Sequence, residues 1–343
     1  MNFTQQARKW QTGSSCDWLD IYQPRGKNGG ALPVPDSNTR PIVLRSLASL
    51  LLIGLLTLAP QNAQANTEVI EIQSGDRVVF LGGTLIEREQ RYSEWEADLT
   101  TMHANKDVTF RNLGWSGDTV WAESRGIFDP PGVGYRRMIE QIHELQPTIV
   151  IICYGNTEAL AGEDKLPAFL KQYAKLLDDI QAVTQTKTSF VLLSPILQCP
   201  VIAPQTVVDF NNRLIAYYAK GIQKMADERQ IPFISQLDLL AKYQDVDGTN
   251  RATDDGIIPN QEGYRLSAQT VWGASDDAVQ NEKLREAIVR KNQYYFQQWR
   301  PQNITYLTGF RKHEQGQNAA ELAEFNALIA TQEKRINELK SQD

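Results

Sequence analysis

The chain has 343 residues, of which 41% are hydrophobic and 22% are charged. This length is sufficient for one large or two modest globular domains with buried cores. These ordinary fractions exclude wholesale disorder and collagen-like or coiled-coil structure. The formal net charge of −6 excludes the basic surface that is typical of nucleic-acid-binding proteins, so we expect no nucleic-acid partner.

The N-terminal region, residues 1–65, has the pattern of a disordered polar leader followed by a secretory signal peptide. Residues 40–45 begin and end with arginine, residues 46–59 form an apolar run, and Ala63 and Ala65 make a small-x-small cleavage site. The apolar run is short for a membrane span. We therefore expect export to the periplasm or the extracellular space, with cleavage after Ala65 and no stable membrane span afterwards. The alternative is an uncleaved N-terminal anchor.

From residue 77 onward, apolar strand patterns alternate with amphipathic helical patterns. The predicted strands cover residues 77–81, 107–113, 148–154, 189–193 and 231–235, and the predicted helices cover 87–103, 135–145, 166–183 and 207–229. The run 148–154 is apolar and β-branched, which is typical of a central parallel strand. The alternation predicts an α/β fold, a three-layer α/β/α sandwich with a five-stranded, flavodoxin-like parallel sheet, over residues 66–275.

The remainder, residues 276–343, changes character. Residues 281–298 have a helical pattern, and residues 319–340 place leucine, isoleucine and phenylalanine side chains on one helical stripe. We expect a helical C-terminal extension that packs on the preceding domain.

Two cysteines, Cys153 and Cys199, would remain after cleavage, because Cys16 lies in the leader. Cysteines of an exported protein can pair. Both, however, lie at or just beyond predicted strand ends, where buried free thiols are also common. The sequence leaves both states open.

Small and polar residues follow the predicted strands. Gly82-Gly83-Thr84 follows the first strand, residues 114–119 the second, residues 154–158 the third, and residues 255–264 lie near the end of the domain. The carboxyl ends of parallel strands meet at one edge of the sheet, where ligands bind. The pattern predicts a pocket at this edge, although loops of this composition are also ordinary in α/β proteins.

In their order, spacing and strand context, these segments resemble the SGNH (GDSL-type) esterases and lipases over residues 75–275. The family pattern is Gly-Asp-Ser after the first strand, a glycine in the next loop, Gly-x-Asn-Asp after the third strand and Asp-x-x-His near the end. Residues 80–84, 112–119, 154–158 and 255–258 stand at these four positions. The resemblance implies an acyl-ester pocket and aligns the loop glycine with Gly117.

The departures from the family pattern concern the catalytic residues. Thr84 stands at the serine nucleophile; its hydroxyl can attack an acyl carbon, but its methyl group crowds the approach. Thr157 occupies the position of the family's oxyanion-binding asparagine, although Asn156 is adjacent. Ile258 stands at the histidine base and cannot accept a proton, which leaves Asp255 without an imidazole to orient.

The resemblance therefore assigns a degenerate site that needs no metal or cofactor. The expected groups are the catalytic positions Thr84 and Asp255, the oxyanion donors Gly117, Asn156 and Thr157, and the ligand contacts Trp115, Tyr154 and Glu158.

Three histidines remain as alternative bases. His103 and His143 lie at the carboxyl ends of predicted helices, where a positive charge is favourable, and we interpret both as structural. His313 lies in a polar segment, where a surface position or a role as substitute base is open.

Two functions follow from this pattern. The first is an exported pseudoenzyme that binds an acyl or carbohydrate ligand, or a protein partner, without turnover. The alternative is an active esterase on short acyl or acetyl groups of saccharides, with Thr84 as nucleophile and a base from elsewhere. A general base contributes roughly 100- to 10,000-fold to the rate, so the loss of histidine favours the pseudoenzyme. A scaffolding role is the third interpretation.

Overall fold

The computed structural model describes residues 71–130, 132–245, 249–273 and 281–340. The expected signal peptide, its cleavage site and Cys16 lie outside these residues. Among the helices of the described residues, none is long and apolar enough to cross a membrane.

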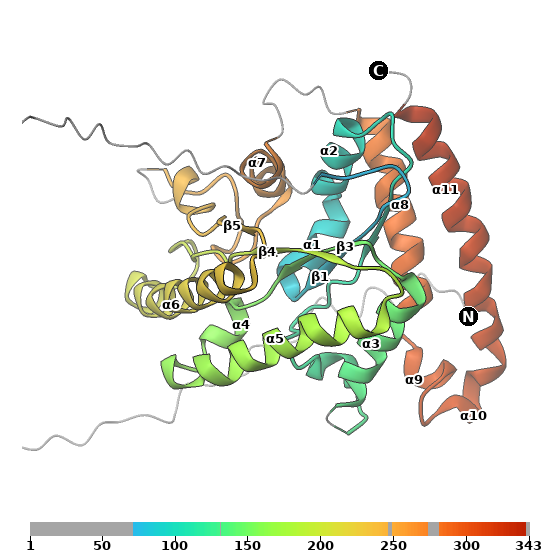
Figure 1. The fold of residues 1–343 in the computed structure, drawn as a ribbon, viewed down its shortest axis with the longest axis horizontal. Helices are drawn as coiled ribbons and strands as arrows, with labels where there is room; N and C mark the ends of the chain where they lie inside the picture. Colours follow the sequence, from blue (N-terminus) through green and yellow to red (C-terminus); the bar gives the residue numbers. More distant parts are fainter. Residues whose placement is uncertain (1–70, 131, 246–248, 274–280, 341–343) are drawn as a thin grey trace, which may run out of the picture. The chain divides into compact units, whose positions relative to one another are not determined.

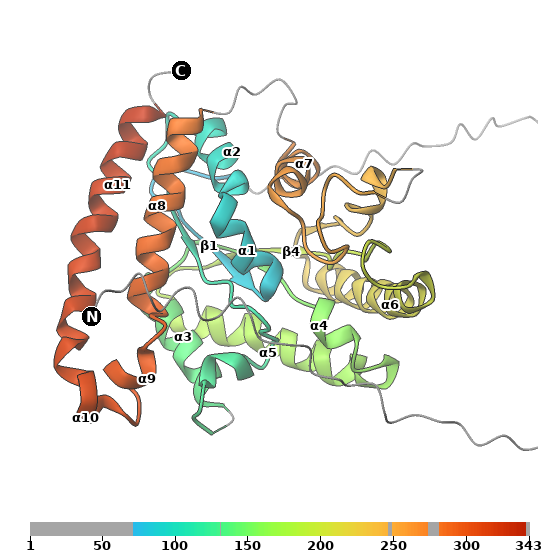
Figure 2. The same ribbon diagram turned by 180° about the vertical axis from the view of Figure 1, so that it is seen from behind.

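Five parallel strands form one sheet in the order β2-β1-β3-β4-β5. The sheet lies between layers of helices (Figures 1 and 2). The strands are β1 (Arg77–Gly82), β2 (Thr109–Asn112), β3 (Ile149–Cys153), β4 (Ser189–Leu193) and β5 (Phe233–Ile234). In the central pairs, Val79 of β1 lies opposite Val150 of β3, and Val150 lies opposite Phe190 of β4. The predicted five-stranded parallel α/β fold is confirmed.

Helices cover both faces of the sheet, which explains why its central strands are apolar without interruption. Val79 and Leu81 belong to a core with helices of one face, whereas Val78 and Phe80 belong to a core with helices of the other. The helices of the first face are α3 (Val133–Leu145), α5 (Leu166–Val183) and α6 (Gln205–Arg229). Those of the second are α1 (Thr84–Tyr92), α2 (Glu94–Met102) and α7 (Gln261–Trp272).

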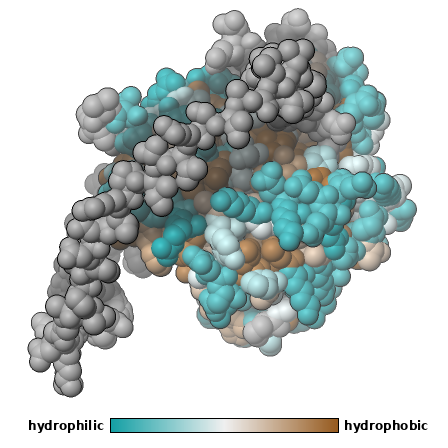
Figure 3. All heavy atoms as spheres, turned by 60° about the vertical axis from the view of Figure 1, so that its left-hand side comes forward, coloured by the Kyte–Doolittle hydropathy of each residue, from teal (hydrophilic) through white to brown (hydrophobic). Residues whose placement is uncertain are grey.

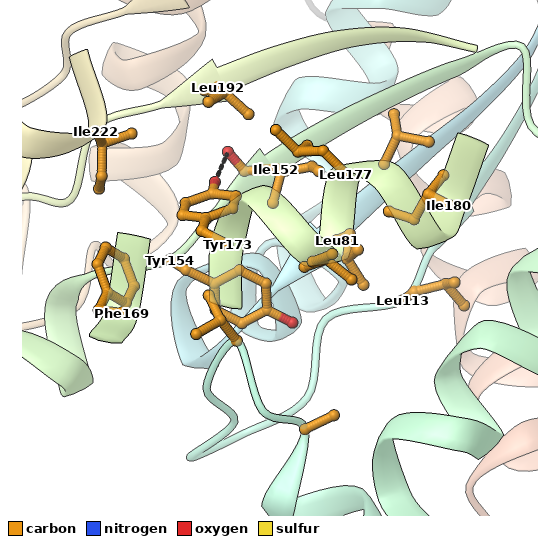
Figure 4. Packing of buried hydrophobic residues seen from close by; sticks show 14 of the residues in the cluster. Leu81, Leu113, Ile152, Tyr154, Phe169, Tyr173, Leu177, Ile180, Leu192 and Ile222 are labelled. Atoms are coloured by element: carbon orange, nitrogen blue, oxygen red, sulfur yellow. Dashed lines mark hydrogen bonds between the residues drawn. The ribbon is translucent and has the colours of Figure 1, made fainter. Parts of the chain in front are cut away.

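Aromatic packing under α5 holds the end of β3. The hydroxyl of Tyr173 points to the Ile152 carbonyl oxygen at 3.5 Å (Figure 4). The ring of Tyr154 meets the Tyr173 ring nearly at a right angle, with centroids 6.0 Å apart. All three residues are buried. This packing holds Tyr154 at the sheet edge, where the short helix α4 (Asn156–Ala159) follows.

The prediction of a single helix over residues 87–103 is wrong, because the structure contains two helices there. The chain breaks at Ser93, which has a left-handed backbone conformation with φ of 54°. The buried Ser93 hydroxyl donates to the Gln90 carbonyl oxygen and accepts from Asn292 of a distant helix. A side chain that bonds to nearby main chain competes with helix continuation. After this break Met102, the last residue of α2, is 46% exposed.

The C-terminal residues form helices that contact the α/β core. They are α8 (Glu282–Trp299), α9 (Ile304–Leu307), α10 (Lys312–Gln315), a 3-10 segment (Gly316–Glu324) and α11 (Phe325–Leu339). Helix α8 packs on α1, α2 and β2, and α11 packs on α8. The predicted helix over residues 319–340 thus begins as 3-10 turns, and its buried stripe is confined to Ile329, Ile336 and Leu339. Further 3-10 turns cover Glu123–Gly126, Glu163–Lys165 and Ala241–Tyr243.

Exposed apolar side chains gather on α6 and just before it. Val207, Phe210 and Tyr217 are 46%, 56% and 44% exposed, and Ile202 is 75% exposed. The α6 side of the molecule shows brown apolar patches among teal hydrophilic side chains (Figure 3). The other side of α6 is buried, and its side chains, such as Ile215 and Tyr218, belong to the core.

The two described cysteines are both free thiols, and both are buried. The Cys153 thiol donates to the Ser194 carbonyl oxygen, and Asn250 donates to the Cys199 sulfur. Burial raises the pKa of Cys153 to about 12. A thiol that is buried and protonated is unreactive.

Glu89 makes stability depend on pH. Its carboxylate is buried between the Trp95 N–H and the Asn112 amide, and burial together with the Glu96 charge raises its pKa from 4.5 to about 8. The folded state therefore binds the Glu89 proton more tightly than the unfolded state does. Protonation of Glu89 thus adds to the free energy of unfolding at low pH, and this contribution is lost as pH rises from about 4.5 to 8. We expect Glu89→Gln to unfold at higher urea concentration than the unaltered protein at pH 9, with a smaller difference at pH 5. A difference that does not change with pH would contradict this assignment.

Candidate active site

Thr84 lies where the first strand passes into the first helix. Strand β1 ends at Gly82, and α1 begins at Thr84 after Gly83. The half-buried Thr84 Oγ1 accepts the main-chain N–H of Gly117 at 2.9 Å. Gly117 has a φ of +70°, a conformation that glycine adopts without strain. The structure therefore brings together the expected nucleophile position and the expected oxyanion glycine.

A cavity of about 220 Å³ opens beside Thr84. Its walls come from the ends of β1 and β3 and from the segment before α7. The lining residues are Gly83, Thr84, Leu85, Asp118, Cys153, Tyr154, Gly155, Asn156, Thr157, Glu158, Leu160, Gln198, Ile257 and Ile258. Six of the side chains singled out in the sequence thus line one cavity at the carboxyl edge of the sheet: Thr84, Tyr154, Asn156, Thr157, Glu158 and Ile258.

The side-chain amide of Asn156 is engaged by the main chain. Its Nδ2 donates to the Ile196 carbonyl oxygen at 2.8 Å, and its Oδ1 accepts the Ile196 N–H at 3.3 Å. This double contact fixes the loop after β4 against α4. The neighbouring Thr157 is exposed and lines the cavity, but it has a hydroxyl and no amide. Of the two expected oxyanion side chains, Asn156 is therefore held by main chain through its oxygen and one of its two N–H groups.

Asp255 stabilises a turn. Its Oδ1 accepts the main-chain N–H groups of Ile257 at 2.7 Å and Ile258 at 2.9 Å, and the Thr253 hydroxyl at 3.2 Å. The turn places Ile258 in the cavity wall, while Asp255 itself is not among the lining residues. The aspartate and the base position are therefore neighbours, and the side chain that faces the cavity is a hydrocarbon.

None of the three histidines lines this cavity. Nδ1 of His103 lies 2.9 Å from the Leu99 carbonyl oxygen, and Nδ1 of His143 lies 2.9 Å from the Val183 carbonyl oxygen. The His103 ring thus bonds to main chain of α2, and the His143 ring, near the carboxyl end of α3, bonds to the last residue of α5. His313 is 74% exposed in α10 and lies 3.6 Å from Glu314.

A buried carboxyl group forms part of the cavity wall. Glu158 accepts the Val120 N–H and the Gly155 N–H, each at 2.9 Å, one on each carboxylate oxygen. Burial raises its pKa to about 7 despite these two hydrogen bonds. Because both oxygens are occupied by main-chain donors, Glu158 ties the loop after β2 to the loop after β3.

A buried ion pair supports the same loop. Arg125 Nε donates to Asp118 Oδ2 at 2.7 Å, and the Tyr154 hydroxyl donates to the same oxygen at 3.3 Å. Arg125 also donates to the Leu113 carbonyl oxygen at 2.7 Å. Sequence reasoning missed Arg125, because an arginine in a 3-10 turn has no signal that distinguishes it from a surface residue.

Trp115, expected as a ligand contact of the Thr84 cavity, lies elsewhere. Its ring is covered by the guanidinium groups of Arg125 and Arg300, whose central carbons lie 5.5 Å and 4.8 Å from a Trp115 ring centroid. It lines separate cavities beside the C-terminal helices.

The family model of the GDSL-like lipases and acylhydrolases matches residues 72–266, more than half of the chain. This chain belongs to that family. The matched region includes both the Thr84 cavity and the Asp255 turn, whereas α8 to α11 lie beyond it. No curated protein sequence matches the chain.

Solved structures of low sequence identity are similar to this GDSL-like protein. A putative GDSL-like lipase from Parabacteroides merdae is 15% identical, with a TM-score of 0.48 over 60% of this chain and 97% of its own. The acetylxylan esterase Axe2 from Geobacillus stearothermophilus is 15% identical, with a TM-score of 0.45 over 59% and 94%. A gut microbial diltiazem-metabolizing enzyme is 17% identical, with a TM-score of 0.45 over 59% of this chain; the match spans 47% of that enzyme.

Proposed function

We propose that this GDSL-family protein binds an acyl or carbohydrate ligand in the Thr84 cavity and hydrolyses esters poorly or not at all. The observation that carries the proposal is the chemistry of the cavity wall. It contains a threonine hydroxyl and an isoleucine at the two positions where the family has nucleophile and base, and no histidine.

A hydroxyl group needs a base to become a nucleophile near neutral pH. Two carboxyl groups line the cavity, and burial raises the pKa of both: that of Asp118, which pairs with Arg125, and that of Glu158, which rises to about 7, in the working range of a base. Both oxygens of Glu158, however, already accept main-chain N–H groups. The hydrogen bond of the Thr84 hydroxyl oxygen is with the Gly117 N–H and not with Glu158, so we assign Glu158 to the support of the loops.

The volume of the cavity favours a small group. About 220 Å³ is below the roughly 300 Å³ at which pockets begin to enclose drug-sized ligands. Apolar Leu85, Leu160 and Ile258 stand beside the polar Thr84 and Thr157 in its wall. This combination suits a short acyl group that is attached to a polar carrier, such as an acylated saccharide.

The test is the hydrolysis of a short chromogenic ester by the unaltered protein and by Thr84→Ala. We expect a rate close to that of buffer and an unchanged rate in the variant, because no base activates Thr84. Thr101→Ala, an exposed threonine of α2, is the matched control. Rapid turnover that Thr84→Ala abolishes and Thr101→Ala preserves would establish the alternative, an active esterase that uses Thr84.

The proposal includes export. Its support is the order of charge, apolar run and small-x-small site in residues 40–65. N-terminal sequencing of the protein from its producing cells should give Asn66 as the first residue. An intact N-terminus in the membrane fraction would contradict cleavage.

A further inference from the structure

A second cavity, of about 310 Å³, lies between the Trp115 loop and the C-terminal helices, and it shares no lining residue with the Thr84 cavity. Its wall combines aromatic rings, hydroxyl groups and one arginine. The lining residues are Glu87, Trp115, Ser116, Ile127, Phe128, Phe296, Arg300, Pro301, Gln302, Ile304 and Thr305.

Arg300 is held between two aromatic side chains. Its guanidinium carbon lies 4.0 Å from the centroid of the Phe296 ring and 4.8 Å from that of a Trp115 ring. Stacking on rings fixes the plane of a guanidinium group and leaves its N–H edge as the part that can donate. Arg300 is thus prepared for a partner that approaches its edge.

No such partner is supplied by the described part of the chain. Neighbouring polar groups have partners: in the cavity wall Ser116 donates to Glu87 at 2.6 Å, and Arg125, which also lies over the Trp115 ring, pairs with Asp118. The main-chain N–H of Arg300 donates to the Phe296 carbonyl oxygen, but its guanidinium group makes no hydrogen bond or ion pair with a described residue, although the charges of Glu87 and Asp118 favour its charged form. Burial and the nearby charge of Arg125 lower its pKa to about 9, so it still carries its charge near neutral pH. A half-buried guanidinium group without hydrogen-bond acceptors is costly, and a bound anion removes that cost.

The other lining groups restrict the kind of anion. Gln302 and Thr305 can exchange hydrogen bonds with hydroxyl groups of a ligand, and Ser116, whose proton is given to Glu87, can accept one. Phe128, which is 76% exposed, offers an aromatic side chain. Glu87 would repel a ligand of high negative charge such as a phosphate dianion. A planar carboxylate matches the bidentate edge of arginine.

We propose that this cavity is a binding site for the carboxylate of a hydroxyl-rich organic acid, of the chemical class of a sugar acid, with Arg300 as the residue that holds the carboxylate. The site goes beyond the Thr84 cavity and does not require ester binding there. It is formed jointly by the GDSL-family region, through the Trp115 loop, and by the C-terminal helices beyond it, through Phe296 and Arg300.

The test is calorimetric titration with methyl glucuronoside, using methyl glucoside as the uncharged control ligand. We expect saturable binding of the acid and at least about tenfold weaker binding of the neutral sugar, because only the carboxylate reaches the arginine edge. Equal affinity for the two sugars, or no binding of the acid, would overturn the proposal.

Three variants separate the site from non-specific charge effects. Arg300→Gln should weaken binding of the acid at least about tenfold, and Arg300→Lys should weaken it less, since a lysine keeps the charge but not the planar fork. Arg136→Gln, which removes an exposed arginine of α3, should not change affinity. Unaltered binding by Arg300→Gln would overturn the proposal.

A variant at Gln302 tests the site even if the Arg300 variants do not fold. Gln302 is exposed and lines the cavity, so Gln302→Trp narrows it without removing a buried contact. We expect this variant to unfold at the same temperature as the unaltered protein and to lose binding of the acid. Retained binding would place the acid elsewhere and overturn the assignment.

Discussion

The combined variant Thr84→Ser, Thr157→Asn and Ile258→His is expected to hydrolyse short acyl esters at least about 100-fold faster than the unaltered protein. The physical reason is that nucleophile and base act as a unit, so each change alone should have little effect. The measurement is the initial rate with a chromogenic acetyl ester for each single variant and for the combination.

The structure supports this design at position 258. Ile258 lines the Thr84 cavity, and Asp255, three residues earlier, uses only its Oδ1 for the turn. Within the described part of the chain, Asp255 Oδ2 has no hydrogen-bond partner, so it can accept from an imidazole introduced at position 258. Thr157→Asn would add an amide at an exposed place in the same wall, where the Asn156 amide is already engaged.

A matched control distinguishes a positioned base from an added imidazole. Ile257 also lines the cavity and is 43% exposed, so Ile257→His in place of Ile258→His adds the same group one residue away. We expect this control combination to stay near the rate of the unaltered protein. A folded triple variant as inactive as this control would show that the shape of the pocket, and not only its residues, has departed from that of the family.

Lys291→Met is expected to lower the free energy of unfolding by about 3–5 kcal/mol. Lys291 is buried in α8, where its Nζ contacts the Glu96 carboxylate of α2 and donates to the Phe110 carbonyl oxygen at 3.0 Å. The second Glu96 oxygen accepts from Asn292 at 3.0 Å. Methionine fills a similar volume but leaves the buried Glu96 charge without its partner. Urea unfolding at neutral pH is the measurement.

Two further variants identify the unpaired charge as the cause. Lys283→Met, at an exposed position of the same helix, should change stability by less than about 0.5 kcal/mol. Adding Glu96→Gln to Lys291→Met removes the isolated charge and should recover part of the loss. A loss below about 1 kcal/mol for Lys291→Met would mean that α8 does not depend on this contact.

The local pattern of the sequence was sufficient for the elements of the sheet and its flanking helices. The predicted helix over residues 166–183 and strand over residues 189–193 coincide with α5 and β4. Their apolar periodicity is local, and it records which side of each segment is buried. The position of Thr84 beside Gly117 also followed from the order of strand ends, because parallel strands bring those ends to one edge.

Only the tertiary structure decided which polar groups are free to act. Asn156 and Ile196 are 40 residues apart, and their contact engages the oxygen and one N–H of the amide that the sequence offered as an oxyanion donor. Lys291 reaches Glu96 across 195 residues, and Arg300 meets Trp115 from beyond the family region. Periodicity along one segment carries no information about a partner on another. The sequence therefore determined the fold and the composition of the Thr84 site, and the packing of distant segments determined which of its groups are occupied and where an unpaired charge remains.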